Sequence, residues 1–106
     1  MPKYLWNVTY TPEGAAGLLA DGGTKRREAI EEMLESVGGR LEALYYAFGS
    51  TDLVVIGELP DQAAAAALSL TTAVGGAANS STTVLLTAEE MDEATRRHVA
   101  YRLPGS

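Results

Sequence analysis

Residues 40–59 read RLEALYYAFGSTDLVVIGEL, and this stretch decides the fold. Two runs rich in β-branched, aromatic and other apolar residues, 40–48 and 52–59, flank the short link Gly49-Ser50-Thr51. Such runs are typical of strands, and so short a link predicts that they pair as a β-hairpin. A helix pattern and then a further strand pattern lie on each side, which predicts the order β-α-β-β-α-β.

The residues before the hairpin predict one strand and two helices. Residues 3–10 (KYLWNVTY) have the composition of a strand, and Thr11-Pro12 is typical of a helix start, with a short helix expected through Leu19. A second helix is expected from Thr24 onward, because apolar residues recur there at helical spacing until Gly38-Gly39 ends the pattern.

The residues after the hairpin complete the pattern. Asp61 is expected to cap a helix through an alanine block to Val74, and residues 81–86 form the fourth strand. Thr87 and Glu90 have the spacing of a capping box, which predicts an added C-terminal helix. Right-handed crossovers then place the first and third strands in the middle of an antiparallel sheet. We expect one α+β domain over residues 1–106, ferredoxin-like, with a four-stranded antiparallel sheet and both crossover helices on one face.

Composition narrows the class of protein. Hydrophobic residues make up 46% and charged residues 21% of the 106 residues, as in ordinary globular proteins. The net charge of −6 disfavours binding to nucleic acid or to anionic membranes. The absence of cysteine removes disulfides and thiolate chemistry. No run has the length of a membrane span, and the start lacks a signal-peptide pattern. We expect a cytoplasmic protein with no nucleic-acid or membrane partner.

Five segments resemble the GYD-domain family. They are residues 10–14, 22–27, 48–52, 83–87 and 101–105, so the resemblance covers nearly the whole chain. It implies a ferredoxin-like fold related to the dimeric α/β-barrel proteins, which include small oxygenases, isomerases and proteins of no known activity. The family is named for a glycine, a tyrosine and an aspartate. Gly49 and Asp52 stand in two of these roles, but Ser50 and Thr51 lie between them. Any role of that tyrosine is therefore not carried over.

Strand alternation predicts two apolar sheet faces. The face under the helices is expected to include the first-strand aromatic residues together with Ala43 and Tyr45. The opposite face is expected to bear six large apolar side chains: Leu44, Tyr46, Phe48, Val54, Ile56 and Leu85. A patch of that size usually marks an interaction surface. We expect a homo-oligomer, a dimer or higher, joined through the open sheet face. The alternative is a monomer in which the segment after the first strand and the C-terminal tail cover this face.

Four residues are candidates for catalysis. Glu58 and Asn7 are expected to be neighbours on the open face, on the hypothesis that the central strands run parallel, with Tyr46 and Thr9 beside them. A carboxylate in a partly dry cavity can have a raised pKa and act as a general acid or base. The alternative is that Glu58 lies at a strand end in water. The only histidine, His98, is expected at the end of the last helix, where it could equally serve the helix dipole.

A basic run suggests an anion site. Residues Gly23, Thr24, Lys25, Arg26 and Arg27 begin the second helix, where cations oppose the helix dipole and free N–H groups can bind an anion. They predict a small anionic ligand. The alternative is that these cations pair with glutamates on the helix surface. The spacing of a phosphate-binding P-loop is missing.

These patterns support two hypotheses about function. No metal site or cofactor is expected, because the chain has one histidine, no cysteine and no matching spacing of carboxylates. The leading hypothesis is an oligomeric small-molecule-binding or interaction protein. The alternative is a cofactor-independent enzyme of the oxygenase or isomerase type, which rests on fold analogy. RNA binding is disfavoured by the acidic charge and by the lack of a basic-aromatic pattern on the third strand.

Overall fold

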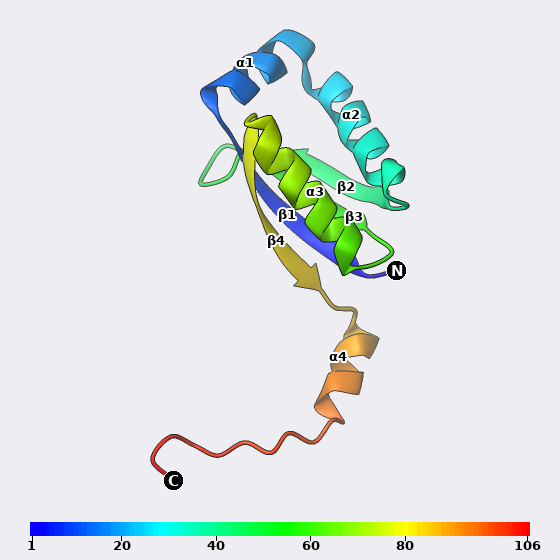
Figure 1. Cartoon of the computed structure of the whole chain (residues 1–106), viewed down its shortest axis with the longest axis vertical. Coiled ribbons are helices and arrows are strands. Elements are labelled where there is room, and N and C mark those ends of the chain that lie inside the picture. The colour runs from blue at the N-terminus through cyan, green and yellow to red at the C-terminus, as the bar shows by residue number, and fades with distance from the viewer.

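The ferredoxin-like α+β fold is confirmed by the structure, a computed structural model that describes residues 1–106. One antiparallel sheet has the strand order β2-β3-β1-β4, with β3 and β1 in the middle (Figure 1). The elements are β1 (Lys3–Tyr10), α1 (Pro12–Asp21), α2 (Gly23–Ser36), β2 (Arg40–Tyr46), β3 (Leu53–Glu58), α3 (Gln62–Gly75), β4 (Ala78–Leu85) and α4 (Ala88–Thr95).

The predicted helix starts are confirmed. The side chains of Thr11 and Asp61 accept hydrogen bonds from backbone N–H groups in the first turns of α1 and α3, and Thr87 and Glu90 form a complete capping box on α4. α1 runs two residues beyond the predicted end. Its Gly14 has a packing reason, because a Cβ there would lie 1.9 Å from the backbone oxygen of Ala77.

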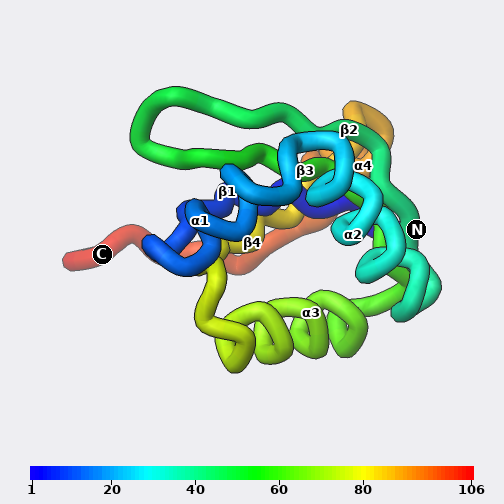
Figure 2. Tube along the Cα trace, turned by 90° about the horizontal axis from the view of Figure 1, so that it is seen from above, coloured from blue at the N-terminus to red at the C-terminus, as the bar shows by residue number.

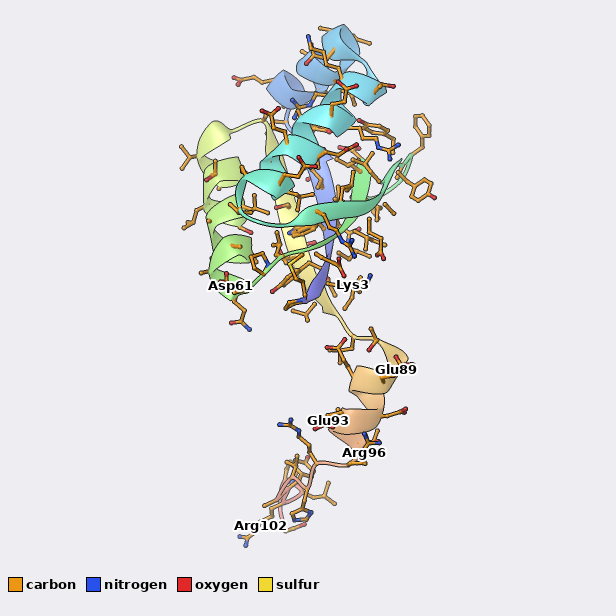
Figure 3. All side chains as sticks on the ribbon, turned by 90° about the vertical axis from the view of Figure 1, so that its right-hand side faces the viewer. Lys3, Asp61, Glu89, Glu93, Arg96 and Arg102 are labelled. Carbon is orange, nitrogen blue, oxygen red and sulfur yellow. The ribbon has the colours of Figure 1, made fainter.

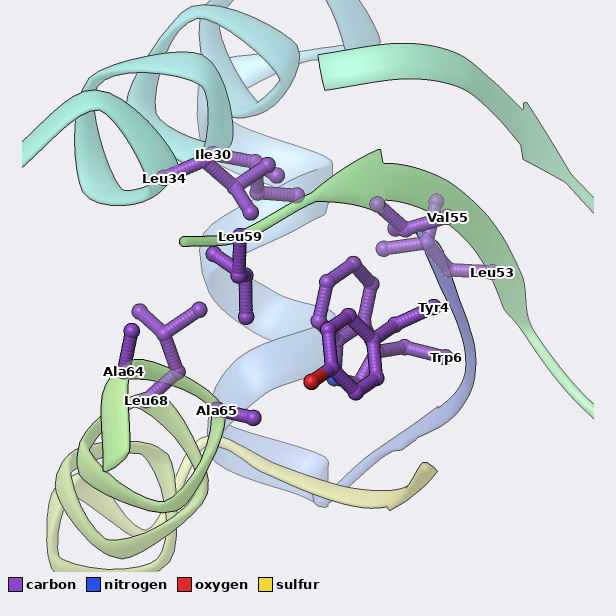
Figure 4. Close-up of a cluster of buried hydrophobic side chains, with 10 residues drawn as sticks. All are labelled: Tyr4, Trp6, Ile30, Leu34, Leu53, Val55, Leu59, Ala64, Ala65 and Leu68. Atoms are coloured by element: carbon purple, nitrogen blue, oxygen red, sulfur yellow. The ribbon is translucent and has the colours of Figure 1, made fainter. Parts of the chain in front are cut away.

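The core lies between the sheet and the helices α2 and α3 (Figures 2 and 4). Tyr4 and Trp6 of β1 stack with their ring centroids 5.7 Å apart. Their neighbours in the core, from β3, its end, α2 and α3, are Ile30, Leu34, Leu53, Val55, Leu59, Ala64, Ala65 and Leu68. Both crossover helices therefore cover the same face of the sheet, as predicted, and the other face has no helix over it.

A bulge in β2 reverses part of the predicted alternation. Leu41 pairs with Gly57, but the next pair is Ala43 with Ile56, so Glu42 is an extra residue on β2. Beyond it, Leu44 and Tyr46 lie on the helix side, and Leu44 packs against the core. Tyr45, by contrast, is 71% exposed. The predicted faces of these residues are wrong, because one inserted residue moves every following side chain to the other face.

The C-terminal segment forms an arm that leaves the body of the protein. Residues 86–106, comprising α4 and an extended tail, run away from the sheet instead of covering it (Figures 1 and 3). All of them are exposed, and the large apolar side chains among them are Leu86, Met91, Val99, Tyr101 and Leu103. The alternative in which the tail covers the open sheet face is therefore wrong for this structure. No helix, in the arm or elsewhere, has the length and apolar content to cross a membrane.

Candidate functional site

Glu58 and Asn7 are not neighbours. The central strands are antiparallel, so Glu58 lies opposite Lys3 and Asn7 lies opposite Val54. Glu58 forms ion pairs with Arg40 and, at 3.7 Å, with Lys3. The hydrogen bond from Arg40 and the charges of Arg40 and Lys3 hold the pKa of Glu58 below its ordinary value. The predicted pairing with Asn7 and the predicted raised pKa are both wrong.

Asn7 and Thr9 instead line a shallow polar hollow on the open face of the sheet. Its other lining residues are Ser50, Thr51, Asn79, Ser80 and Ser81, and its volume is about 500 Å³. None of the lining side chains carries a charge, and none is hydrophobic. The hollow can therefore offer hydroxyl and amide hydrogen bonds but has no group that titrates near neutral pH.

The two remaining catalytic candidates lie elsewhere. Tyr46, on the helix side, donates a hydrogen bond from its hydroxyl to the backbone oxygen of Gly23 at 2.9 Å and so holds the first turn of α2. His98 follows the end of α4 and is exposed on the arm. Its predicted place at the helix end is wrong, because the helix stops at Thr95. The four candidates are thus in four separate places.

The basic run divides into two kinds of cation. Lys25 pairs with Asp21 at 3.6 Å and Arg27 with Glu31 at 3.3 Å, each one helical turn away. Arg27 therefore follows the predicted alternative of pairing with a glutamate, whereas Lys25 pairs with an aspartate at the end of α1. Arg26 is half-buried and has no carboxylate within ion-pair distance. It faces inward on α2 with Ile30, four residues further along the same helix side.

Arg26 lines a cavity between the sheet, α2 and α3. The cavity has a volume of about 240 Å³ and lies beside the aromatic side of the core. Its lining is mostly apolar, with hydroxyl groups contributed mainly by α3. The lining includes Trp6, Tyr10, Arg26, Ile30, Met33 and Ser69. An apolar cleft with a few polar groups is the usual form of a small-molecule site.

Tyr10 supplies the most unusual polar group of this cavity. Its hydroxyl is buried and has no hydrogen-bond partner. Burial raises the pKa of Tyr10, while the charge of Arg26 and the close approach of its guanidinium to the hydroxyl act in the opposite direction. That approach does not reach hydrogen-bond geometry, so the hydroxyl stays unpaired. The backbone of Tyr10 is fixed, because its N–H donates to Oδ2 of Asp52 at 2.8 Å. The hydroxyl is therefore a protonated, rigidly held donor at neutral pH.

Tyr10 was expected only as one of the aromatic residues on the helix-covered face of the sheet. The special position of Arg26, by contrast, can be found in the sequence. A helical residue pairs with positions four before and four after it. Those positions hold acids for Lys25 and Arg27, as described above. For Arg26 they hold Gly22 and Ile30, so its guanidinium has no partner on its own helix.

The family model for the GYD domain matches residues 4–95, from β1 to the end of α4. The chain belongs to the GYD-domain family. Comparison with curated proteins gives no match. The matched part of the GYD domain contains both Tyr10 and Arg26 and the whole lining of the cavity. Within it, Asp52 has the structural task of holding β1 to the start of β3, since its backbone N–H also donates to the backbone oxygen of Val8 at 2.9 Å.

The arrangement is suited to binding. The cavity presents one cation and one phenol against apolar walls, and such a lining can hold a small molecule with an apolar body and a polar end. No three His, Asp or Glu side chains gather closely enough to hold a metal ion. The long-range ion pairs, those of Glu42 and Glu58 with Lys3 and Arg40, lie at the far end of the sheet.

Proposed function

We propose that this GYD-domain protein is an oligomeric small-molecule-binding protein whose ligand occupies the cavity between the sheet, α2 and α3. The observation that carries the proposal is the buried hydroxyl of Tyr10, which has no partner. Leaving such a group unpaired costs about 1–3 kcal/mol, and most buried polar groups in proteins are satisfied. A ligand that accepts a hydrogen bond from Tyr10 would remove this cost.

A cavity-filling variant tests the binding proposal. Ser69 lines the cavity, so Ser69→Phe places a ring in the space available to a ligand. Ala73 is exposed on the same helix and does not line the cavity, which makes Ala73→Phe the matched control. Native mass spectrometry would report any retained ligand, and calorimetry would report binding of 2-naphthylmethanol as a neutral probe. We expect binding by the wild type and by Ala73→Phe only. Equal binding by Ser69→Phe would refute this site.

A homo-oligomer is supported by two surfaces that the chain itself leaves uncovered. The first is the open sheet face, where Leu5, Val54, Ile56 and Leu85 are half-buried and no helix lies over them. The second is the arm. α4 has only eight residues, and an isolated helix of that length is marginal in water, so its order favours a surface to pack against.

We propose that a second copy supplies that surface. The arm continues directly from β4, next to Leu85 on the open face, so an arm can reach across a partner that covers this face. In a two-fold dimer each arm would do the same for the other subunit. The charges of the arm also suit a reciprocal contact. Arg96 and Arg97 pair with Glu93 within the arm, whereas Glu89 and Arg102 are left for a partner (Figure 3).

Size-exclusion chromatography with light scattering tests the oligomer. We expect an oligomer for the wild type at micromolar concentration, and monomers for Ile56→Glu and for a chain ending at Leu86. Val74, which is 88% exposed on α3, provides the control variant Val74→Glu, expected to stay oligomeric. Circular dichroism would show whether each variant is folded. A monomeric wild type would end this part of the proposal.

The alternative function, a cofactor-independent oxygenase or isomerase, has less support. Its candidate residues were Glu58, Asn7, Tyr46 or His98, and the structure places the four apart from one another. The lowered pKa of Glu58 also makes this side chain a poor proton donor at neutral pH. Binding is the function that the geometry supports best.

A further inference from the structure

We infer that the cavity accepts a small apolar monocarboxylate, most simply an aromatic acid, with its carboxylate between the guanidinium of Arg26 and the hydroxyl of Tyr10. This inference rests on the proposed function and names the chemical class of its ligand. The two polar groups come from separate parts of the chain. Tyr10 ends β1 and Arg26 belongs to the first turns of α2, and the fold brings both to the same cavity.

Arg26 indicates that the ligand carries a negative charge. Its neighbours Lys25 and Arg27 both have carboxylate partners, whereas the half-buried Arg26 has none. A partly desolvated cation without a counter-ion is costly, and a ligand carboxylate would provide one. The fork of N–H groups on arginine also matches the two oxygens of a carboxylate.

The hydroxyl of Tyr10 adds a second donor. Because burial raises the pKa of Tyr10, its hydroxyl stays protonated at neutral pH and donates rather than accepts. A guanidinium and a phenol that both donate require a ligand group that accepts at more than one position. A carboxylate meets this requirement, while an amine or an ammonium group does not.

The apolar lining of the cavity indicates that the rest of the ligand is apolar. Trp6, Ile30, Met33 and Leu68 surround the space, and Trp6 offers an aromatic ring as part of the lining. A volume of about 240 Å³ is smaller than that of most drug-sized pockets. It holds about eight water molecules at about 30 Å³ each, which suits one or two fused rings rather than a chain or a nucleotide.

A ligand with one negative charge suits this cavity better than a ligand with two. Arg26 is the one cation in the lining. The carboxylate of Asp52 lies close behind, bound to the backbone N–H of Tyr10 at 2.8 Å, and its charge contributes to raising the pKa of Tyr10. A dianionic phosphate would meet this repulsion with only one counter-charge. The chemistry of the site therefore favours a carboxylate over a phosphate.

Calorimetry with three naphthalene probes tests the inference: 2-naphthoate, the neutral 2-naphthylmethanol and 2-naphthyl phosphate. For the wild type we expect 2-naphthoate to bind about tenfold or more tightly than the alcohol, as a charge-assisted hydrogen bond should give. Arg26→Met should remove this preference while its affinity for 2-naphthylmethanol stays unchanged. Arg27→Met, whose side chain pairs outward with Glu31, is the matched control and should keep the full preference.

The outcomes separate the inference from the proposal on which it rests. Equal binding of acid and alcohol by the wild type would overturn the inference and leave the binding function standing, as would tighter binding of the phosphate. The same holds if Arg27→Met loses as much preference as Arg26→Met. Failure of every probe to bind, together with the absence of a retained ligand, would overturn the binding function itself. Tyr10→Phe gives a second variant, expected to weaken the acid about threefold or more.

Discussion

Replacing Tyr10 by phenylalanine should stabilise the ligand-free protein. The buried hydroxyl of Tyr10 makes no hydrogen bond, so the variant removes a polar group that folding takes out of water without compensation. Such a group costs about 1–3 kcal/mol when left unpaired. The guanidinium of Arg26 lies close enough to the hydroxyl to lower its pKa, which offsets part of this cost, so we take the lower end, about 1 kcal/mol. For a domain of this size that raises Tm by about 4 °C.

The measurement compares thermal melts of two tyrosine variants whose changes in Tm are expected to have opposite signs. Ligand is first removed by unfolding and refolding, and the wild type, Tyr10→Phe and Tyr46→Phe are compared. Tyr46 is the matched control, because its hydroxyl does have a partner, the backbone oxygen of Gly23 at 2.9 Å. Its side chain is partly exposed, so its loss should cost only about 0.5 kcal/mol and lower Tm. One hydroxyl therefore destabilises the protein and the other stabilises it.

Adding ligand should shrink the stability advantage of Tyr10→Phe, because threefold weaker binding offsets about 0.65 kcal/mol of it. At one concentration of 2-naphthoate, the protein that binds it more tightly is stabilised more, so the wild type should gain more than Tyr10→Phe. A Tm of ligand-free Tyr10→Phe below that of the wild type would refute the reasoning. It would mean that the hydroxyl already has a stabilising partner in the empty protein, and the observation that carries the proposed function would be lost.

Three further predictions test the scaffold. Gly39→Ala places a Cβ 2.3 Å from the backbone oxygen of Glu58 and should cost about 1–3 kcal/mol in urea unfolding, whereas Gly49→Ala, which meets nothing within 4 Å, should not. Glu58 has a lowered pKa, so its stabilisation is present at neutral pH and is lost as pH falls below about 4.3; the Tm difference between the wild type and Glu58→Gln should shrink from pH 7 to pH 3, and a constant difference would contradict this. Asp52→Ala removes the acceptor for the N–H of Tyr10 and should cost about 1–3 kcal/mol, most of which Asp52→Asn should restore.

The elements of the fold could be predicted because their signals are local. Thr11, Asp61 and the pair Thr87 and Glu90 each act within one helical turn, and the structure confirms all of them as caps. The sheet order followed from the hairpin and from crossover handedness, neither of which needs long-range information. The direction of the arm could not be predicted in the same way. The sequence signals of a capped helix are the same whether the helix packs on its own chain or on another.

The faces of β2 were predicted wrongly because a bulge depends on pairing across strands. Even so, the sequence holds a hint. Leu41 and Leu44 are three residues apart, and a regular strand cannot place both on one face. Both pack against the core, which requires an extra residue between them, and Glu42 is that residue. Its side chain lies on the open side, where it forms an ion pair with Lys3.

The site was predicted in part for a similar reason. The basic run at the start of α2 was the right place to look, but the run as a whole is not the site. Only Arg26 lacks an acid one turn before and after it, and only Arg26 lines the cavity. Its partner Tyr10 is 16 residues away in the chain, at the end of β1, so no local pattern joins the two. Their meeting depends on how α2 lies on the sheet.

The bulge links these observations, because it places the side chain of Tyr46 against the start of α2. By moving Tyr46 to the helix side, it lets that hydroxyl hold the backbone oxygen of Gly23, the first residue of α2. Arg26 follows within one turn, so its place in the cavity depends on this anchor. The same shift leaves Ala43 and Tyr45 on the open face instead of Leu44 and Tyr46, which makes that face less apolar than predicted. The case for a second subunit therefore depends more on the arm than on the sheet, and a chain ending at Leu86 is the more decisive variant.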